Sequence, residues 1–145
     1  MAQVSRVANE YTVLGVHTLS TAFITSATHT TYQDEGLTLS VTYLPSRILR
    51  VSVNLNPIPS GALQSMGFQV LRSATSLREF LIHSAALSAA AITNGVFSHT
   101  FNGPATGATE TFKLQVKAID ANTSVQSFGS AAYPRQLIVE DLGSQ

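Results

Sequence analysis

Four stretches of the chain alternate apolar and polar residues with a period of two. They cover residues 37–43, 51–55, 97–101 and 112–118. Side chains of a β-strand point to opposite sides of the sheet in turn, so each stretch predicts a strand with one face in a core and one toward solvent. Half-buried strands of this kind are typical of antiparallel sheets. The sequence therefore predicts an all-β protein.

Turn-forming residues separate these stretches. Residues 34–36 predict a turn before the first stretch, and residues 44–46 predict a corner after it. Residues 56–61 contain two prolines and a glycine, and they predict a loop because proline cannot donate to the hydrogen-bond ladder of a sheet. Residues 102–109 predict a second, longer loop.

Two hairpins are also predicted. Asn94-Gly95 is a strong signal for a two-residue hairpin turn, because both residues tolerate positive φ angles. Residues 68–72 and 77–83 form the arms of another predicted hairpin, joined by residues 73–76. Residues 77–92 also fit a helix, since Leu, Arg, Glu and Ala favour one, and this alternative stays open.

These signals together predict an antiparallel β-sandwich, jelly-roll-like, with an extended N-terminal arm. About eight or nine short strands with regularly spaced turns are typical of that architecture. At 145 residues the chain suits one domain. We assign residues 1–32 to the N-terminal arm and first strand, and residues 33–145 to the β-sandwich domain.

The charge content limits the possible partners. Only 11% of the residues are charged, and eight Lys and Arg balance eight Asp and Glu. A typical domain carries about 25% charged residues, so much of this surface must consist of Ser, Thr, Asn, Gln and Ala. The chain lacks a basic stripe for nucleic acid and an apolar run long enough for a membrane helix, so neither partner is expected. The absence of Cys fits assembly in a reducing cytoplasm.

The residue pattern does not favour catalysis or a cofactor. The four histidines, at positions 17, 29, 83 and 99, lack the short spacing typical of metal ligands, and His99 shares a strand face with Phe97 and Phe101, which predicts a core histidine. The adjacent carboxylates at 34–35 and 140–141 would face opposite sides of a strand. We therefore predict no catalytic, cofactor-binding or metal-binding residues. Arg47 and Arg50 are expected to be solvated or paired with Glu140 and Asp141.

The C-terminal sequence resembles that of a known group of proteins. Residues 133–143, Y-P-R-Q-L-I-V-E-D-L-G, resemble the closing strand of small β-sandwich proteins from tailed bacteriophage virions, where a V-E-D-I-G-like sequence often ends the chain. Residues 42–51, and residues 98–101 leading to 111–115, are similar to the same group. The resemblance covers about residues 37–143, with Leu142 in place of the commoner Ile.

The resemblance implies a virion structural protein of the head-decoration, minor tail or fibre type. The length of the chain favours a capsid decoration, or cement, protein that binds the outer surface of the capsid and is assembled in the cytoplasm of a bacterial host. The expected partners are the major capsid protein and further copies of the chain in a homotrimer. The arm is expected to lie across capsid subunits through five apolar residues: Val4, Val7, Tyr11, Phe23 and Ile24.

Three alternatives remain open. A tail-fibre or minor tail protein would act as a receptor-binding tip and contact a glycan through residues 56–61 and 102–109, although neither segment holds an aromatic residue for a sugar face. A small hydrolase is disfavoured because the chain has no G-x-S-x-G elbow. A cell-surface adhesion domain is disfavoured by the lack of an export signal.

Overall fold

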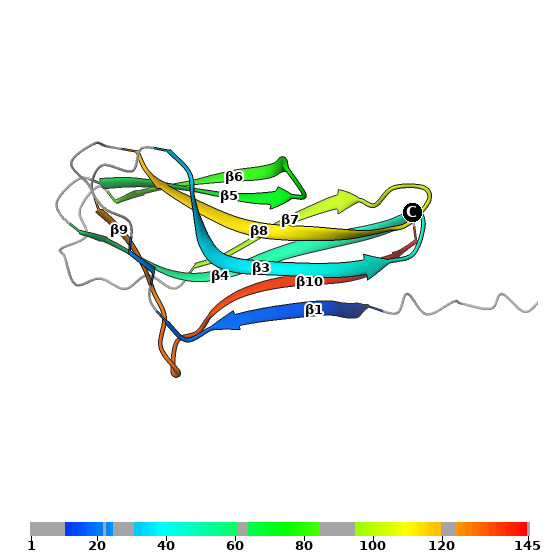
Figure 1. The fold of residues 1–145 in the computed structure, drawn as a ribbon, viewed down its shortest axis with the longest axis horizontal. Helices are drawn as coiled ribbons and strands as arrows, with labels where there is room; N and C mark the ends of the chain where they lie inside the picture. The colour runs from blue at the N-terminus through cyan, green and yellow to red at the C-terminus, as the bar shows by residue number, and fades with distance from the viewer. Residues whose placement is uncertain are drawn as a thin grey trace, which may run out of the picture.

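The computed structural model describes residues 11–21, 23–24, 31–60, 64–84, 95–119 and 124–144, with side chains for all of these except 23–24, 56–60, 64–65, 82–84 and 124–128. Every regular element in these ranges is a strand (Figure 1). None of the described residues forms a helix long and apolar enough to cross a membrane. The strands are β1 (Thr12–Leu19), β2 (Phe23–Ile24), β3 (Gln33–Tyr43), β4 (Arg47–Ser60), β5 (Gln64–Arg72), β6 (Thr75–Ser84), β7 (Gly95–Asn102), β8 (Ala108–Ala118), β9 (Ser124–Phe128) and β10 (Arg135–Ser144).

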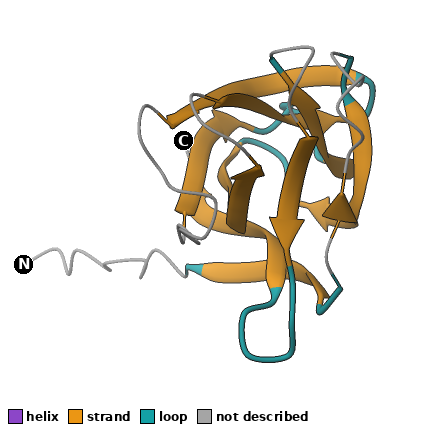
Figure 2. Cartoon of the chain, turned by 90° about the vertical axis from the view of Figure 1, so that its left-hand side faces the viewer, coloured by secondary structure: helices purple, strands orange, loops and turns teal. Residues whose placement is uncertain are grey.

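The strands form two antiparallel sheets around a common core (Figure 2). Sheet I contains β1, β10, β4 and β7 side by side, and the far end of β4 also pairs with β9, which pairs with β2. Sheet II has the order β3-β8-β5-β6. With the two short strands left aside, β1-β10-β4-β7 facing β3-β8-β5-β6 is the strand arrangement of a jelly roll. The predicted antiparallel β-sandwich is confirmed, while residues 1–10 of the predicted extended arm lie outside the described residues.

The core lies between the sheets and follows the alternation of the sequence. The buried apolar residues come from β3, β4, β5, β8 and β10, and the polar residues between them point outward. The largest apolar side chains that are less than 2% exposed are Phe68 and Phe112. All four stretches predicted from their alternation lie in strands, because burying one face of each is the main favourable term available to such a chain.

Two predicted connections are confirmed. β3 ends at Tyr43 and β4 begins at Arg47, so residues 44–46 form the predicted corner, with Ser46 at a positive φ of 52°. β7 ends at Asn102 and β8 begins at Ala108, so residues 103–107 form the predicted loop. The two connections lie against each other, since the Ser46 N–H donates to the Pro104 carbonyl at 3.1 Å.

The loop predicted at residues 56–61 is wrong for the part that the structure describes. β4 continues to Ser60, and Pro57 and Pro59 lie opposite Ser127 and Val125 of β9. In a strand, the backbone nitrogens of residues two apart point toward the same edge. The two prolines, which lack an N–H, are therefore compatible with pairing to β9 when their nitrogens point toward the opposite edge of β4. The prolines therefore limit which edge of β4 can pair with another strand, but they do not end the strand.

The turn predicted at residues 34–36 is also wrong. These residues lie inside β3, where the pairing with β8 shifts between Asp34 and Thr38 and Gly36 adopts a φ of +91°. The irregularity is a β-bulge, which re-aims side chains without ending the strand. It leaves the Asp34 side chain 56% exposed and the Glu35 side chain 0% exposed.

The hairpin of β5 and β6 is confirmed, with its turn at residues 73–74. The alternative helix is wrong for residues 77–84, which belong to β6, and its remainder lies outside the described residues. β7 begins at Gly95, while Asn94 and the strand predicted before it also lie outside the described residues.

A buried ion pair joins the two sheets. Arg135 begins β10 in sheet I and is 2% exposed, and its Nη1 donates to the carboxylate and to the backbone carbonyl of Glu35 in sheet II. Its Nε also donates to the Thr21 carbonyl, which follows β1, at 2.8 Å. One side chain therefore ties together β10, the bulge of β3 and the end of β1.

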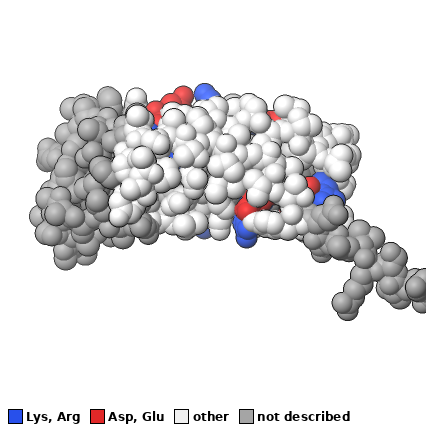
Figure 3. Space-filling model, turned by 90° about the horizontal axis from the view of Figure 1, so that it is seen from below, with Lys and Arg blue, Asp and Glu red and all other residues white. Residues whose placement is uncertain are grey.

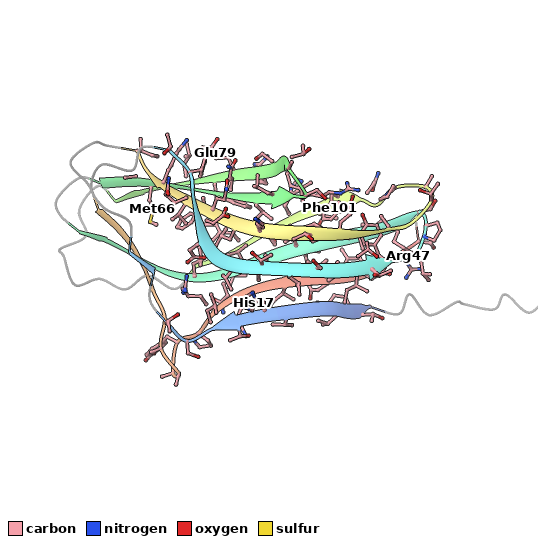
Figure 4. All side chains as sticks on the ribbon, in the orientation of Figure 1. His17, Arg47, Met66, Glu79 and Phe101 are labelled. Atoms are coloured by element: carbon pink, nitrogen blue, oxygen red, sulfur yellow. The ribbon has the colours of Figure 1, made fainter. Side chains whose placement is uncertain are left out.

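A second polar cluster lies near the other end of the sandwich. Glu110 of β8 accepts hydrogen bonds from Arg72 and from the Tyr43 hydroxyl. The Arg72 guanidinium lies 5.3 Å from the ring centre of Phe101 in β7 (Figure 4 labels Phe101). Burial and the hydrogen bond to Glu110 raise the pKa of Tyr43 to about 12. Burial opposes ionisation of Glu110, but the donors Arg72 and Tyr43 outweigh it and lower the pKa of Glu110.

We predict that Glu35→Gln strongly destabilises the fold. Removal of one partner leaves the Arg135 charge buried without its counter-ion, which typically costs about 3–5 kcal/mol. Asp34→Asn is the matched control, because Asp34 is the neighbouring carboxylate and its pair with Lys113 is exposed, so it should cost at most about 1 kcal/mol. Urea unfolding curves of the two variants measure the difference, and equal midpoints would contradict the prediction.

We predict an alkaline stability loss that depends on Tyr43. Its pKa is raised from 10 in the unfolded chain to about 12 in the fold, so its stabilising contribution is complete below pH 10 and is lost as pH rises through about 12. The free energy of unfolding should fall more steeply over this range in the wild type than in Tyr43→Phe. Equal slopes for the wild type and Tyr43→Phe would contradict the prediction.

Candidate assembly surface

The residues predicted for an interface are only partly described. Val4 and Val7 lie outside the described residues. Phe23 and Ile24 form β2, whose backbone pairs with Ser127 and Gln126 of β9, while their side chains are outside the described part. Tyr11 directly precedes β1 and is 53% exposed. The structure therefore places Tyr11 apart from β2, at the opposite end of β1.

A bulge in β1 gives this strand an apolar outer side. The pairing of β1 with β10 shifts between Val13 and Gly15, so Leu14 is an extra residue. Leu14 packs against the core, and a Cβ on Gly15 would lie 3.1 Å from side-chain atoms of Leu39 and Val41. Val13 and Val16 consequently both face outward, 49% and 48% exposed, although a regular strand would put them on opposite sides.

The outward face of sheet I continues from these valines across four strands. Residues opposite each other in antiparallel strands share a face, and the registers align three rows: Val13, Glu140, Arg50 and Thr100; Val16, Ile138, Ser52 and Ser98; Thr18, Gln136, Asn54 and Val96. We call these twelve residues the sheet I face. It is uncharged except for Arg50 and Glu140. In the view of Figure 3, charged residues form only small, separate groups on the surface.

The two charges of the sheet I face neutralise each other. The Arg50 Nε donates to the Glu140 carboxylate at 2.6 Å, and its Nη2 donates to the Tyr11 hydroxyl at 2.7 Å. The Arg50 guanidinium also lies 5.5 Å from the centre of the Tyr11 ring. Burial raises the pKa of Glu140. This cluster adds an aromatic side chain to the apolar edge made by Val13 and Val16.

The outward face of sheet II has a different character. Asp34 accepts from Gln115 at 2.7 Å and pairs with Lys113, and the Gln115 hydrogen bond lowers the pKa of Asp34. Lys117 pairs with Glu79, which also accepts from the Tyr32 hydroxyl (Figure 4 labels Glu79). Burial and this bond raise the pKa of Tyr32. Sheet II therefore presents a hydrated network of charges, which sheet I lacks.

Charge pairing extends over the whole described surface. All six described carboxylates form ion pairs, and among the described cations only Arg78 is outside these pairs. Arg47 and Arg50 were expected to be solvated or paired with Glu140 and Asp141, and the structure shows pairing, Arg47 with Asp141 and Arg50 with Glu140. No part of the described surface offers a cluster of unpaired charges to an ionic ligand.

The described residues offer little for a metal or catalytic site. They contain no group of three His, Asp or Glu residues placed to hold a metal ion. His99 shares a half-buried face of β7 with Phe97 and Phe101, as predicted. His17 accepts a hydrogen bond at Nδ1 from the backbone N–H of Thr38 at 3.0 Å and thereby joins β1 to β3. His29 and the side chain of His83 lie outside the described part.

A groove of about 370 Å³ opens at the end of the sandwich where β4 begins. Its lining includes Leu14, the 66% exposed Leu44, and the pair of Arg47 with Asp141 (Figure 4 labels Arg47). The Arg47 Nε donates to both Asp141 oxygens, at 2.9 and 2.8 Å, so the two charges of the lining are paired with each other. The groove is a hollow between the sheets, lined by residues of β1, β3, β4 and β10.

Sequence reasoning missed Val13 and Val16 as surface residues. Residues three apart lie on opposite faces of a regular strand. The bulge at Leu14 puts Val13 and Val16 on the same face. The available signal was Gly15, since an isolated glycine in a strand often marks a bulge or a close approach.

Comparisons with known proteins give no family. No protein-family model and no curated protein matches the chain. Among solved structures, the infectious bursal disease virus VP2 subviral particle has a TM-score of 0.47 at 10% identity, covering 94% of this chain and 38% of that one. The Gx strain structure of the same virus has a TM-score of 0.43 at 11% identity (88% and 36% covered), and the Gt strain structure 0.38 at 14% (90% and 38%). The chain thus spans little more than a third of these viral chains, and function does not transfer at this level of similarity.

Proposed function

We propose that this protein is a virion structural protein, and specifically a bacteriophage capsid decoration protein that binds the major capsid protein on the outer surface of the shell and stabilises it. In this proposal the chain is not an enzyme. The supporting observation is the sheet I face, a surface of the jelly roll whose only charges are the paired Arg50 and Glu140, with Tyr11, Val13 and Val16 exposed along one edge.

The composition of the sheet I face suits a protein interface. The centres of interfaces are depleted in charged residues because a buried charge must lose its water, and aromatic residues are enriched there. The one ion pair on this face is already formed, so a partner would not have to supply a counter-charge. The network on sheet II is suited to remain in water.

The size of the face indicates what else must contribute. Four strands about 4.8 Å apart, each rising about 3.3 Å per residue over the roughly five residues that the three rows span, cover roughly 320 Å². A specific interface uses about 800 Å² per partner. The face can therefore supply less than half of one interface, and we propose that Val4 and Val7, which precede Tyr11 in the chain, contribute to the rest.

We also propose that the protein forms a homotrimer. Closed rings satisfy every subunit's interface and are the usual form of soluble oligomers. A ring lying on the shell through sheet I would leave sheet II facing solvent.

The receptor-binding alternative is weaker than the sequence suggested. It needs two loops at one end of the sandwich, but residues 56–60 belong to β4 and are paired with β9. Of the two segments predicted to contact a glycan, only the second contains a loop among the described residues, at residues 103–107.

We predict that Val16→Asp abolishes binding to the shell while the protein stays folded. Val16 is 48% exposed, so the change should affect stability little, but a carboxylate buried without a partner at the interface should weaken binding at least about tenfold. The matched control is Leu81→Asp, since Leu81 is 54% exposed on the outward face of sheet II. Cosedimentation with shells that lack the protein measures both variants.

The location of the protein tests the proposal independently. An antibody against the purified chain should label the outer shell of intact particles of the virus that encodes it. Label at the tail end would instead support a minor tail or fibre protein. Particles without label, or equal shell binding by Val16→Asp and the wild type, would overturn the proposed role of the sheet I face.

A further inference from the structure

β7 is the least protected sheet edge among the residues that the structure describes. It pairs with β4 on one side, and no strand among the described residues pairs with its other side. Its eight residues, Gly95–Asn102, contain no charge, and its pairing with β4 has no register shift. Natural edge strands usually carry charges, prolines or bulges that prevent pairing with another chain.

Of the other four edge strands among the described residues, β2 is only two residues long, and the remaining three carry such protection. β3 contains two carboxylates and a bulge, and β6 contains Arg78 and Glu79 and lies beside a register shift of β5. β1 has its own bulge and lies against β3, to which His17 joins it. An open and flat edge is therefore specific to β7 within the described part of the chain.

The sequence of β7 is nearly palindromic. Residues 97–101 read Phe-Ser-His-Thr-Phe, so the strand presents almost the same side chains in both directions from His99. If two copies of the strand pair antiparallel with His99 on a two-fold axis, Phe97 faces Phe101 of the other copy and Ser98 faces Thr100. Aromatic pairs and hydroxyl pairs are both favourable across strands. The protein already contains two such hydroxyl pairs, Ser40 with Thr111 and Thr42 with Thr109, each at 2.7 Å.

The inward side of β7 is held in place and still partly accessible. The Phe97 ring centre lies 5.9 Å from that of Phe68 and 5.4 Å from that of Phe80, and the Phe101 centre lies 5.7 Å from that of Phe112. Phe97, His99 and Phe101 are nevertheless only half-buried, and Val96 on the outward side is 72% exposed. A second strand would cover surface that is already ordered, which lowers the entropy cost of association.

Charge also favours a second copy as the occupant. The formal net charge of the chain is +0, and the described carboxylates are paired within the molecule. Two identical copies therefore approach without net electrostatic repulsion. A charged partner of a different kind would find no complementary group on β7.

We propose that two copies of this chain associate through their β7 strands, paired antiparallel around a two-fold axis at His99. The contact joins the two copies of sheet I into one continuous sheet. It does not depend on capsid binding and uses a different edge from the one formed by Tyr11, Val13 and Val16.

Disulfide trapping tests the contact and its register. The chain contains no cysteine, so introduced thiols have no native competitor. Directly opposed residues in an antiparallel pair have Cα atoms about 4.5–5.5 Å apart, within the range of a disulfide. His99→Cys should form a covalent dimer on mild oxidation. Ser98→Cys alone should not, whereas a mixture of Ser98→Cys and Thr100→Cys should form the mixed dimer.

A charge at the edge provides a second measurement. Ser98→Lys places a lysine beside the axis in each copy, and sedimentation equilibrium should show a dimer at least about tenfold weaker than the wild type. Ser52→Lys is the matched control, because Ser52 lies directly opposite Ser98 on β4, on the same face and one strand away from the edge. It should leave the dimer intact.

The outcomes separate this proposal from the proposed function. A monomeric wild-type chain would overturn both the β7 contact and the homotrimer, whereas a trimer without further association would overturn the β7 contact alone. A dimer that Ser98→Lys leaves unchanged would overturn the β7 contact without affecting capsid binding. Cross-linking through Val16→Cys in place of His99→Cys would likewise overturn it, since Val16 lies on β1, at the other edge of sheet I.

Discussion

The fold depends on a buried ion pair at the point where three parts of the chain meet. Arg135 reaches Glu35 across the sandwich and also donates to the Thr21 carbonyl. The bulge around Gly36 aims the Glu35 carboxylate inward, and Gly129 leaves room, because a Cβ there would lie 2.3 Å from the Thr21 oxygen. A buried pair of this kind contributes little net stability but makes alternative arrangements costly, since any of them would leave a charge unpaired. We infer that it fixes how sheet I lies over sheet II.

The other described carboxylates are also paired within the molecule. A chain with 11% charged residues has few groups to spare, and the described carboxylates are all used in pairs. The pairs are distributed unequally, with a hydrated network over sheet II and a single neutralised pair on the sheet I face. The two outer faces of one sandwich therefore differ in what they can contact. The outer face of sheet II is suited to contact water, and that of sheet I is suited to contact an uncharged protein surface.

Much of this architecture could be predicted from the sequence, and the misses share a cause. Alternation predicted the strands because burial of one face acts residue by residue. The pairing of Arg47 and Arg50 with Asp141 and Glu140 was one of the two outcomes expected for these cations. The buried Glu35, the bulge of β1 and the strand through Pro57 were missed, because each depends on a partner far away in sequence. From sequence alone a carboxylate such as Glu35 is expected at the surface, because its buried partner Arg135 lies one hundred residues later in the chain.

The β7 palindrome shows the same dependence on topology. The Phe-Ser-His-Thr-Phe sequence is visible in the chain, but only the strand order shows that it lies on an open edge. A register with His99 on the axis pairs residues of equal parity, so the outward faces of both copies lie on the same side of the joined sheet. A dimer would then present two sheet I faces together. A shell that binds one face would bind the second at a high effective concentration, so edge pairing would strengthen capsid binding without any new contact to the capsid.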